Sequence, residues 1–236
     1  MDSPCGRFVT LDAAQTIVQV DFSPGNFAVD CAEACGIYPG DEGRRLLQEM
    51  LFLRWKTYRR LNEAREPAGC DDFWIALVAD WLASLHEDAG RARELLGVGQ
   101  DLLYGPERRY FRLYVDTVPA LDRLAHLGVR LGVVSNWDYT LERVLKHLGI
   151  HDRFEFVLAS LVEGMEKPDP RFFWWAAECF PAERSAVVHV GDNPLDDVSG
   201  ARGAGLQALL LSRERTNSEG SVIHSLLAIP EALSWR

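Results

Sequence analysis

The sequence lacks the patterns that mark membrane and nucleic-acid-binding proteins. No stretch approaches the ~20 apolar residues that a membrane span requires, and residues 1–7 show no charged segment followed by an apolar run. Lys and Arg form no basic block, and the formal net charge is −10. Because nucleic-acid binding depends on clustered basic side chains, we expect no nucleic-acid partner. Because apolar spans and a leader-like segment are lacking, we expect no membrane partner and a cytoplasmic location.

Cysteine is also scarce, and its pattern excludes two further classes of protein. The cysteines are odd in number and show no CxxC pair and no nearby His at zinc-ligand spacing; they are Cys5, Cys31, Cys35, Cys70 and Cys179. Neither a disulfide framework nor a zinc site is therefore indicated. We expect reduced, buried thiols in a chain whose 236 residues, 47% of them hydrophobic, suffice for one core and a smaller attached module.

Short apolar runs recur along the chain and predict buried parallel strands. Each run ends in polar or glycine-rich residues; the runs are 8–11, 131–134, 156–159, 186–190 and 206–211, and a polar loop follows the last one at 213–221. Helical patterns, each stopped by Gly or Pro, lie between them at 118–127, 141–148, 171–180 and 195–204. This alternation predicts a doubly wound α/β sheet whose polar strand ends gather at one edge.

The stretch from about residue 24 to 110 breaks this alternation, because it shows helical patterns without a convincing strand. We interpret it as an inserted helical cap. The chain then divides into a core domain of residues 1–20 and 111–236 and a cap domain of residues 21–110. The cap's aromatic residues stand at helical spacing, which favours packing within the cap over lining of a substrate pocket; they are Phe52, Trp55, Tyr58, Phe73, Trp74 and Trp81.

Four segments with reactive side chains follow predicted strands. They contain Asp12 and Thr16, then Ser135-Asn136, then Glu166-Lys167-Pro168-Asp169-Pro170, and finally Gly191-Asp192 with Asp196-Asp197. Each segment alone is explained by an ordinary turn or helix cap. Together they supply a nucleophilic carboxylate, a hydroxyl, an ammonium and a carboxylate-rich loop, and phosphoryl transfer with Mg²⁺ requires this set.

In this order the four segments resemble the four motifs of the haloacid dehalogenase (HAD) superfamily. The helical insert after the first motif is similar to the type 1 cap of its subfamily I, and segments 135–138 and 166–170 look like the branch of haloacid dehalogenase-like domain-containing protein 3. The resemblance implies a HAD-like α/β core and a Mg²⁺-dependent hydrolase, most simply a phosphatase. Its partner would be a small phosphorylated metabolite, and we expect a monomer or a homodimer.

The resemblance also implies catalytic and substrate-binding roles. Asp12 would be the nucleophile that forms an aspartyl-phosphate. Ser135 and the Asn136 amide would hold the phosphoryl group, and Thr16 would belong to the same binding site. Lys167 would stabilise Asp12 and the transferred charge.

The metal ligands implied by the resemblance come from the first and fourth motifs. Asp12, the backbone carbonyl of Ala14 and Asp192 would bind Mg²⁺. The second acid of the fourth motif stands at either of two positions in this family, so both Asp196 and Asp197 qualify. We favour Asp197 as the further member of the metal site, where it would orient Lys167 or a metal-bound water.

The first motif departs from the family pattern at two positions. Ala14 stands where phosphatases of the family carry a second aspartate, which protonates the leaving group and later activates water. General acid/base assistance of this kind contributes ~10²- to 10⁴-fold to a rate. Gln15 stands where glycine is common and would let the backbone turn sharply; we expect Gln15 to tolerate the local dihedral angles and to point to solvent.

Four functional alternatives follow from these departures. The first is a phosphatase for acyl or aryl phosphates, whose leaving groups need little protonation, or one in which Asp138 or a cap residue replaces the acid. The second is cleavage of a carbon–phosphorus bond, as in phosphonoacetaldehyde hydrolases, which also carry Ala at this position. The third is a metal-independent 2-haloacid dehalogenase, which the acidic fourth segment disfavours. The fourth is a binding or regulatory module that has lost catalysis.

Carbon–phosphorus cleavage would need a lysine of the cap that forms a Schiff base. Lys56 is the single lysine of the proposed cap, so it is the candidate for this role. It stands among arginines on an amphipathic pattern, which is more typical of the solvated side of a helix. We expect the cap to set substrate specificity by opening and closing over the site.

Overall fold

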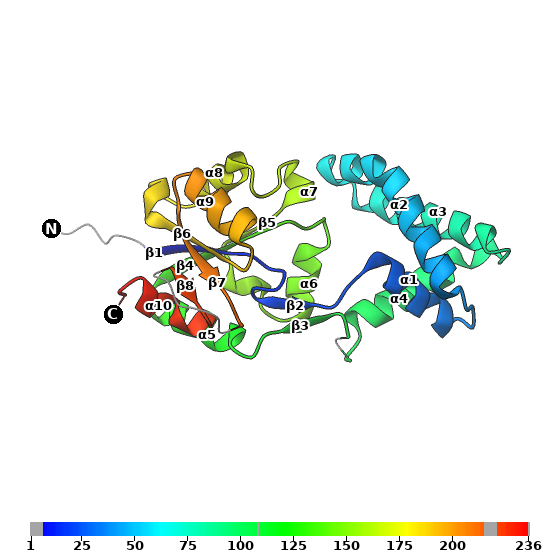
Figure 1. The fold of residues 1–236 in the computed structure, drawn as a ribbon, viewed down its shortest axis with the longest axis horizontal. Helices are drawn as coiled ribbons and strands as arrows, with labels where there is room; N and C mark the ends of the chain where they lie inside the picture. The colour runs from blue at the N-terminus through cyan, green and yellow to red at the C-terminus, as the bar shows by residue number, and fades with distance from the viewer. Residues whose placement is uncertain (1–6, 108, 215–220, 236) are drawn as a thin grey trace. The chain divides into compact units, whose positions relative to one another are not determined.

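The computed structural model describes residues 7–107, 109–214 and 221–235 (Figure 1). Its contacts divide the chain into two compact units. The core unit comprises Met1–Gln19 and Leu113–Arg236, and the helical unit comprises Val20–Arg112.

The core unit contains a six-stranded parallel sheet in the order β5-β4-β1-β6-β7-β8. The strands are β1 (Arg7–Leu11), β4 (Val129–Ser135), β5 (Phe156–Ala159), β6 (Val187–Gly191), β7 (Gln207–Leu211) and β8 (Val222–Ile223). The prediction of a doubly wound parallel sheet is confirmed. The predicted end of the sheet at residue 211 is wrong, because β8 follows β7; a strand of two residues carries too little pattern to be recognised. Residues 215–220 of the predicted polar loop lie outside the described residues.

Helices cover both faces of this sheet. Figure 1 shows α8 (Pro170–Glu178) and α9 (Gly200–Gly203) on one side, and α5 (Thr117–His126) and α10 (Ile229–Ala232) on the other. Two further helices, α6 (Leu141–His147) and α7 (Ser160–Glu163), follow β4 and β5. The α8–α9 side packs onto the sheet through buried apolar side chains that include Phe8, Phe173 and Ala201. Burial of each large side chain contributes roughly 1.5–3 kcal/mol.

The segment 195–204, which was predicted to be helical, contains two kinds of helix. Residues Pro194–Ser199 form a π-helical turn, and the α-helix is confined to Gly200–Gly203. The Asn193 side chain accepts the backbone N–H groups of Leu195 and Asp196, while the Asn193 carbonyl accepts the N–H of Val198 at 3.3 Å. The bond from Val198 spans five residues, as in a π-helix, and π-helical turns are frequent at functional sites.

Two short strands connect the core unit to the helical unit. They are β2 (Val18–Val20) and β3 (Phe111–Leu113), which pair in a separate two-stranded sheet. Neither was predicted, because three residues are too few to show an alternating pattern.

The helical unit consists mainly of α1 (Pro24–Ala34), α2 (Gly40–Glu63), α3 (Pro67–Ser84) and α4 (Ala92–Tyr104). Trp81 is fully buried and donates from Nε1 to the Gly43 carbonyl at 2.7 Å. Tyr58 is also buried and packs against the rings of Phe73 and Trp74. The expectation that the aromatic residues pack within the cap is wrong for Phe52, whose residue is 80% exposed, and holds only partly for Trp55, which is 39% exposed.

The cysteines of the described residues are free thiols. Cys31 and Cys70 are buried and Cys35 is partly buried, but Cys179 is exposed, so the expectation of buried thiols is wrong for Cys179. Cys5 lies outside the described residues. Within the described chain, every helix is too short or too polar to cross a membrane.

Candidate active site

The predicted site residues of three segments lie at the carboxyl ends of neighbouring strands. Asp12 directly follows β1, Ser135 is the last residue of β4, and Asp192 directly follows β6. Because β4, β1 and β6 are adjacent and parallel, their carboxyl ends meet at one edge of the sheet. Ligands bind at this edge in open α/β sheets.

A buried lysine joins two carboxylates at this edge. Lys167 Nζ lies 2.8 Å from Asp12 Oδ1 and 2.6 Å from Asp197 Oδ1. All three side chains are at least nine-tenths buried. Burial by itself would lower the pKa of Lys167, but the charges of Asp12 and Asp197 outweigh it and raise that pKa above its ordinary value. The lysine therefore stays charged beside the proposed nucleophile.

A second buried side chain, which the sequence analysis missed, supports Asp197. His189 lies opposite Thr10 in the β1–β6 register. Its Nδ1 is 2.9 Å from Thr10 Oγ1, and its Nε2 is 3.0 Å from Asp197 Oδ1. Burial by itself would raise the pKa of Asp197, but the hydrogen bond from His189 and the charge of Lys167 lower it well below its ordinary value. Asp197 is therefore held as a carboxylate.

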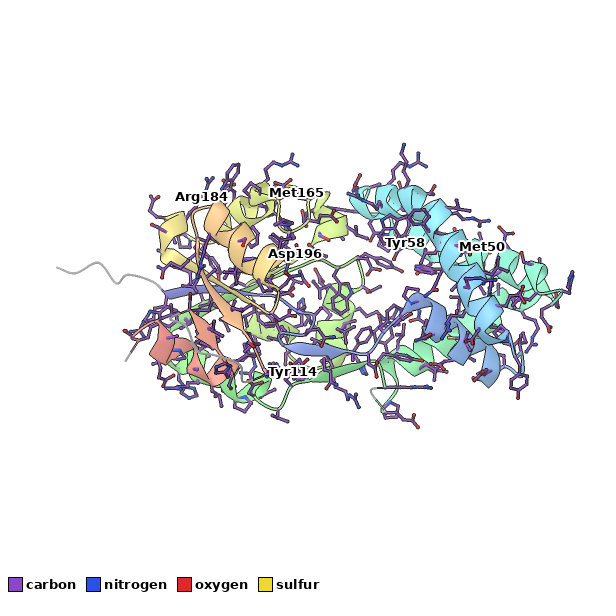
Figure 2. The ribbon with its side chains drawn as sticks, viewed as in Figure 1. Met50, Tyr58, Tyr114, Met165, Arg184 and Asp196 are labelled. Carbon is purple, nitrogen blue, oxygen red and sulfur yellow. The ribbon has the colours of Figure 1, made fainter. Side chains whose placement is uncertain are left out.

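The π-helical turn decides which of the two acids of the fourth motif meets the lysine. Asp197 is buried, and its Oδ2 accepts the backbone N–H of Asn193 at 2.9 Å. Asp196, labelled in Figure 2, instead accepts a hydrogen bond from the Asn193 amide at 3.0 Å. Gly191 makes room for Asp197, because a Cβ atom at position 191 would lie 2.1 Å from Asp197 Cγ. The structure thus brings Asp197 rather than Asp196 to Lys167.

Asp192 lies between these acids and the first motif. Its Oδ1 accepts a hydrogen bond from the buried Thr16 hydroxyl at 3.2 Å. Burial, together with the charges of Asp12 and Asp197, raises the pKa of Asp192 to about 6. The carboxylates repel each other in a partly buried place, which a bound cation would relieve.

These acids fit a divalent cation. Asp12, Asp192 and Asp197 each offer a carboxylate oxygen, and the three oxygens lie within 4.8 Å of one another. Lys167 contributes one positive charge against three carboxylates, which leaves two negative charges at the site. Carboxylate oxygens are the ligands that Mg²⁺ prefers, so the donor set and its charge both match Mg²⁺.

The second motif contributes the hydroxyl of Ser135 and the amide side chain of Asn136. Ser135 is fully buried, and its Oγ has no hydrogen-bond partner among the described residues. A buried hydroxyl without a partner costs free energy unless a ligand engages it. The Asn136 side chain accepts from the Lys167 backbone N–H at 2.8 Å and donates to the Lys167 carbonyl at 3.0 Å. Asn136 therefore ties the second and third motifs together.

The loop of the first motif is held by residues far away in the sequence. Gln15 has a φ angle of 55° and an exposed side chain, as expected, yet its Oε1 accepts a hydrogen bond from Tyr114 at 2.8 Å. Figure 2 labels Tyr114. Burial raises the pKa of Tyr114, so its hydroxyl retains its proton and donates. The guanidinium of Arg213 lies 3.7 Å from the centre of the Tyr114 ring and donates to the Thr16 carbonyl at 2.7 Å.

Asp138 and Lys56 each belong to one of the functional alternatives drawn from the sequence. The carboxylate of Asp138 accepts hydrogen bonds from the backbone and hydroxyl of Thr140 at 2.9 and 2.6 Å, so it caps the turn that precedes α6. Lys56 is exposed on α2. Its exposure agrees with the solvated side of an amphipathic helix.

With this fold and this site, the chain belongs to the haloacid dehalogenase-like hydrolase family. The model of that family matches residues 42–205. Lys167, Asp192 and Asp197 lie within the matched residues, and Asp12 precedes them.

Two related proteins are similar in sequence to part of this chain. The human haloacid dehalogenase-like hydrolase domain-containing protein 3 is 44% identical over 84 residues, which are 36% of this chain and 34% of that protein. Phosphoserine phosphatase of Thermus thermophilus is 36% identical over 132 residues, which are 54% of this chain and 51% of that protein. The chain thus matches between a third and a half of the length of these relatives.

A solved structure extends the likeness over nearly the whole chain. The 2-haloacid dehalogenase of Pseudomonas syringae has a TM-score of 0.69 and 25% sequence identity, and the superposition covers 97% of this chain and 98% of that chain. It supports the α/β core with an inserted helical region.

Proposed function

We propose that the protein is a Mg²⁺-dependent phosphatase that hydrolyses a small phosphorylated metabolite through an aspartyl-phosphate on Asp12. The observation that carries this proposal is the pairing of buried Asp12 with Lys167 at 2.8 Å, beside two further carboxylates that fit a divalent cation. The likeness to a phosphoserine phosphatase supports phosphate chemistry.

In the proposed reaction, an Asp12 carboxylate oxygen attacks phosphorus, and the bond from phosphorus to the leaving oxygen breaks with its electron pair on that oxygen. Lys167 offsets the negative charge of the attacked group, and the Ser135 hydroxyl donates to a phosphoryl oxygen. Bound Mg²⁺ would supply further positive charge at the phosphoryl oxygens. Water then attacks the phosphorus, which releases phosphate and restores the Asp12 carboxylate.

Asp197 and His189 act on this reaction through Lys167. Asp197 accepts from Lys167 at 2.6 Å and from His189 at 3.0 Å, so it fixes the ammonium next to Asp12. Fixed charges of this kind need no reorganisation during the reaction, which is how a preorganised site stabilises a transition state.

The substrate class follows from Ala14. Its methyl group donates no proton to the leaving oxygen, so the leaving group departs as an anion or takes its proton from water. We therefore propose substrates with acidic leaving groups, such as acyl or aryl phosphates, over simple alkyl phosphates.

Dehalogenation of a 2-halo acid is a second candidate function, which the likeness to the Pseudomonas syringae enzyme favours. That reaction needs the Asp12 nucleophile but no metal. The three converging carboxylates count against it, because without a cation they repel each other and keep the pKa of Asp192 raised to about 6. Halide release from 2-chloropropanoate in the presence of a chelator separates this function from the phosphatase.

The phosphatase is tested by turnover of para-nitrophenyl phosphate with Mg²⁺, whose nitrophenolate leaves without protonation. We expect Asp12→Asn to reduce kcat by about 10⁴-fold or more, because it removes the nucleophile. The control is Asp152→Asn, an exposed carboxylate outside the site, which should retain full activity. Undiminished turnover in Asp12→Asn would refute the nucleophile, and an inert natural protein that still binds Mg²⁺ would favour a binding module.

A further inference from the structure

Gln15 occupies a backbone conformation that favours glycine. Its φ angle of 55° lies in the left-handed region, which costs free energy in any residue with a Cβ atom. Its backbone N–H donates to the Val18 carbonyl at 2.7 Å, so the turn is tight. The strained residue directly precedes Thr16, whose hydroxyl contacts Asp192 of the acidic cluster. Contacts from outside the loop must therefore hold it in place.

Two side chains, Tyr114 and Arg213, supply these contacts, and we call them the brace. Tyr114 donates to Gln15 Oε1 at 2.8 Å, and Arg213 Nη2 donates to the Thr16 carbonyl at 2.7 Å. The guanidinium of Arg213 lies over the Tyr114 ring, an arrangement in which a planar cation is attracted to an aromatic face. Asp116 holds Arg213 from the other side through Nη1 at 3.0 Å.

The brace reaches the acidic cluster through Thr16. The Thr16 side chain is fully buried, and its hydroxyl donates to Asp192 Oδ1 at 3.2 Å while Arg213 binds its carbonyl. A shift of the loop would move this hydroxyl away from Asp192. The same shift would move the Ala14 carbonyl, which precedes the strained residue.

We propose that Tyr114 and Arg213 are positioning residues that keep the Gln15 loop in its left-handed conformation, so that the loop and Asp192 are set for a divalent cation. The inference rests on the proposed metal site. In this chain, a strained Gln15 held by Tyr114 and Arg213 would take the place of the glycine of the family pattern.

The first test is a double-mutant cycle of Tyr114→Phe and Gln15→Gly, with Mg²⁺ affinity of the metal-stripped chain measured by calorimetry. We expect Tyr114→Phe to weaken Mg²⁺ binding by about 3- to 10-fold, the effect of one hydrogen bond. In the Gln15→Gly background the same change should alter the affinity less than about twofold, because glycine adopts φ 55° without strain and leaves no amide oxygen to hold.

Matched controls separate positioning from general stability. Tyr38→Phe, at a residue of the helical unit that is 80% exposed, should leave Mg²⁺ affinity unchanged. Arg213→Lys should weaken binding, because an ammonium cannot cover the ring and bind Thr16 and Asp116 together. Arg184→Lys, at an arginine 4.8 Å from the Trp174 ring and outside the site, should not. Equal effects of Tyr114→Phe in both backgrounds would mean a merely structural role and would overturn the proposal.

A metal-free readout keeps this inference separable from the proposed function. Hydrogen exchange of the loop amides, which bond to the Ala13 and Val18 carbonyls, should accelerate in Tyr114→Phe without any cation present. If natural protein fails to bind Mg²⁺ but exchange accelerates, the metal site is refuted and the brace stands as a loop support only. If exchange and Mg²⁺ affinity are both unchanged in Tyr114→Phe, the brace is refuted.

Discussion

On one side of the candidate site, Lys167 lies buried between Asp12 and Asp197, and His189 fixes Asp197 from within the sheet. On the other side, Gln15 is exposed, strained at φ 55° and held by Tyr114. The first side holds the charged groups of the proposed phosphoryl transfer. The second side carries Ala14 and Gln15, where the family pattern has an aspartate and commonly a glycine.

In the proposed mechanism, nucleophilic attack and leaving-group protonation therefore belong to separate parts of the site. The charged side depends on burial and mutual pairing, so a change there should cost both stability and rate. The loop side depends on single hydrogen bonds from Tyr114 and Arg213, so a change there should cost less. We therefore expect changes on the charged side to lower stability more than changes on the loop side.

Removing the buried ammonium should have the largest effect on stability. Lys167→Met removes the charge partner of buried Asp12 and leaves Asp197 with its hydrogen bonds from His189 and the Asn193 N–H, so we expect the free energy of unfolding to fall by about 3–5 kcal/mol. Lys146→Met is the control, because Lys146 forms an exposed pair with Glu142 at 2.9 Å and should lose less than about 1 kcal/mol. Urea denaturation of both variants measures the two losses, and similar values would contradict the ranking.

A smaller loss of stability is expected when a side chain at position 191 fills the space that Asp197 occupies. In Gly191→Ala the new methyl group would lie 2.1 Å from Asp197 Cγ, so the carboxylate must move away from Lys167. We expect a loss of about 1–3 kcal/mol in the free energy of unfolding. Gly203→Ala, in α9 with open space around the added atom, should be neutral or stabilising by up to about 1 kcal/mol. Thermal denaturation compares the two, and equal melting temperatures would refute the steric argument.

Replacement of Asp116, which holds Arg213 of the brace, should have the smallest effect on the free energy of unfolding. This effect should depend on pH. Burial by itself would raise the pKa of Asp116, but hydrogen bonds from Ser225 and the Leu226 N–H and the charge of Arg213 hold it below its ordinary value of 3.8. A lowered pKa means that the carboxylate stabilises the fold above the pKa of the unfolded chain. This stability is lost as the pH falls through the lower pKa of the folded state.

The corresponding variant is Asp116→Asn. We expect it to lose about 1 kcal/mol at pH 7, and we expect the difference from the natural protein to shrink below pH 3.8. Urea denaturation at several pH values measures this difference. If the difference in the free energy of unfolding grew as the pH fell, the conclusion that folding lowers the pKa of Asp116 would be contradicted.

The fold and the motif residues were largely predictable, because their signals are local. Apolar runs predicted five of the six strands of the main sheet. Because these strands run in parallel, Asp12, Ser135 and Asp192 lie at one edge of the sheet. The choice of Asp197 over Asp196 was favoured from the family pattern, but its physical cause, the π-helical turn capped by Asn193, has no recognisable signal in sequence.

The supporting residues were missed because their contacts are distant in sequence. Tyr114 and Arg213 meet the first motif across 99 and 197 residues, and no local pattern marks such pairs. His189 and Thr10 did leave a signal, because each is a polar residue within an apolar strand. Polar residues in two buried parallel strands need partners, and their pairing in the register supplies one.

One comparison tests whether the site acts through Asp12 without a group that protonates the leaving oxygen. It measures kcat/KM with Mg²⁺ for aryl and alkyl phosphates in the natural protein and in Ala14→Asp. We expect the natural protein to prefer aryl phosphates strongly, and Ala14→Asp to gain about 10²-fold or more on alkyl phosphates with little change on aryl phosphates. A natural protein that hydrolyses both classes equally well, with no gain in Ala14→Asp, would contradict the account, because another group would then supply the proton.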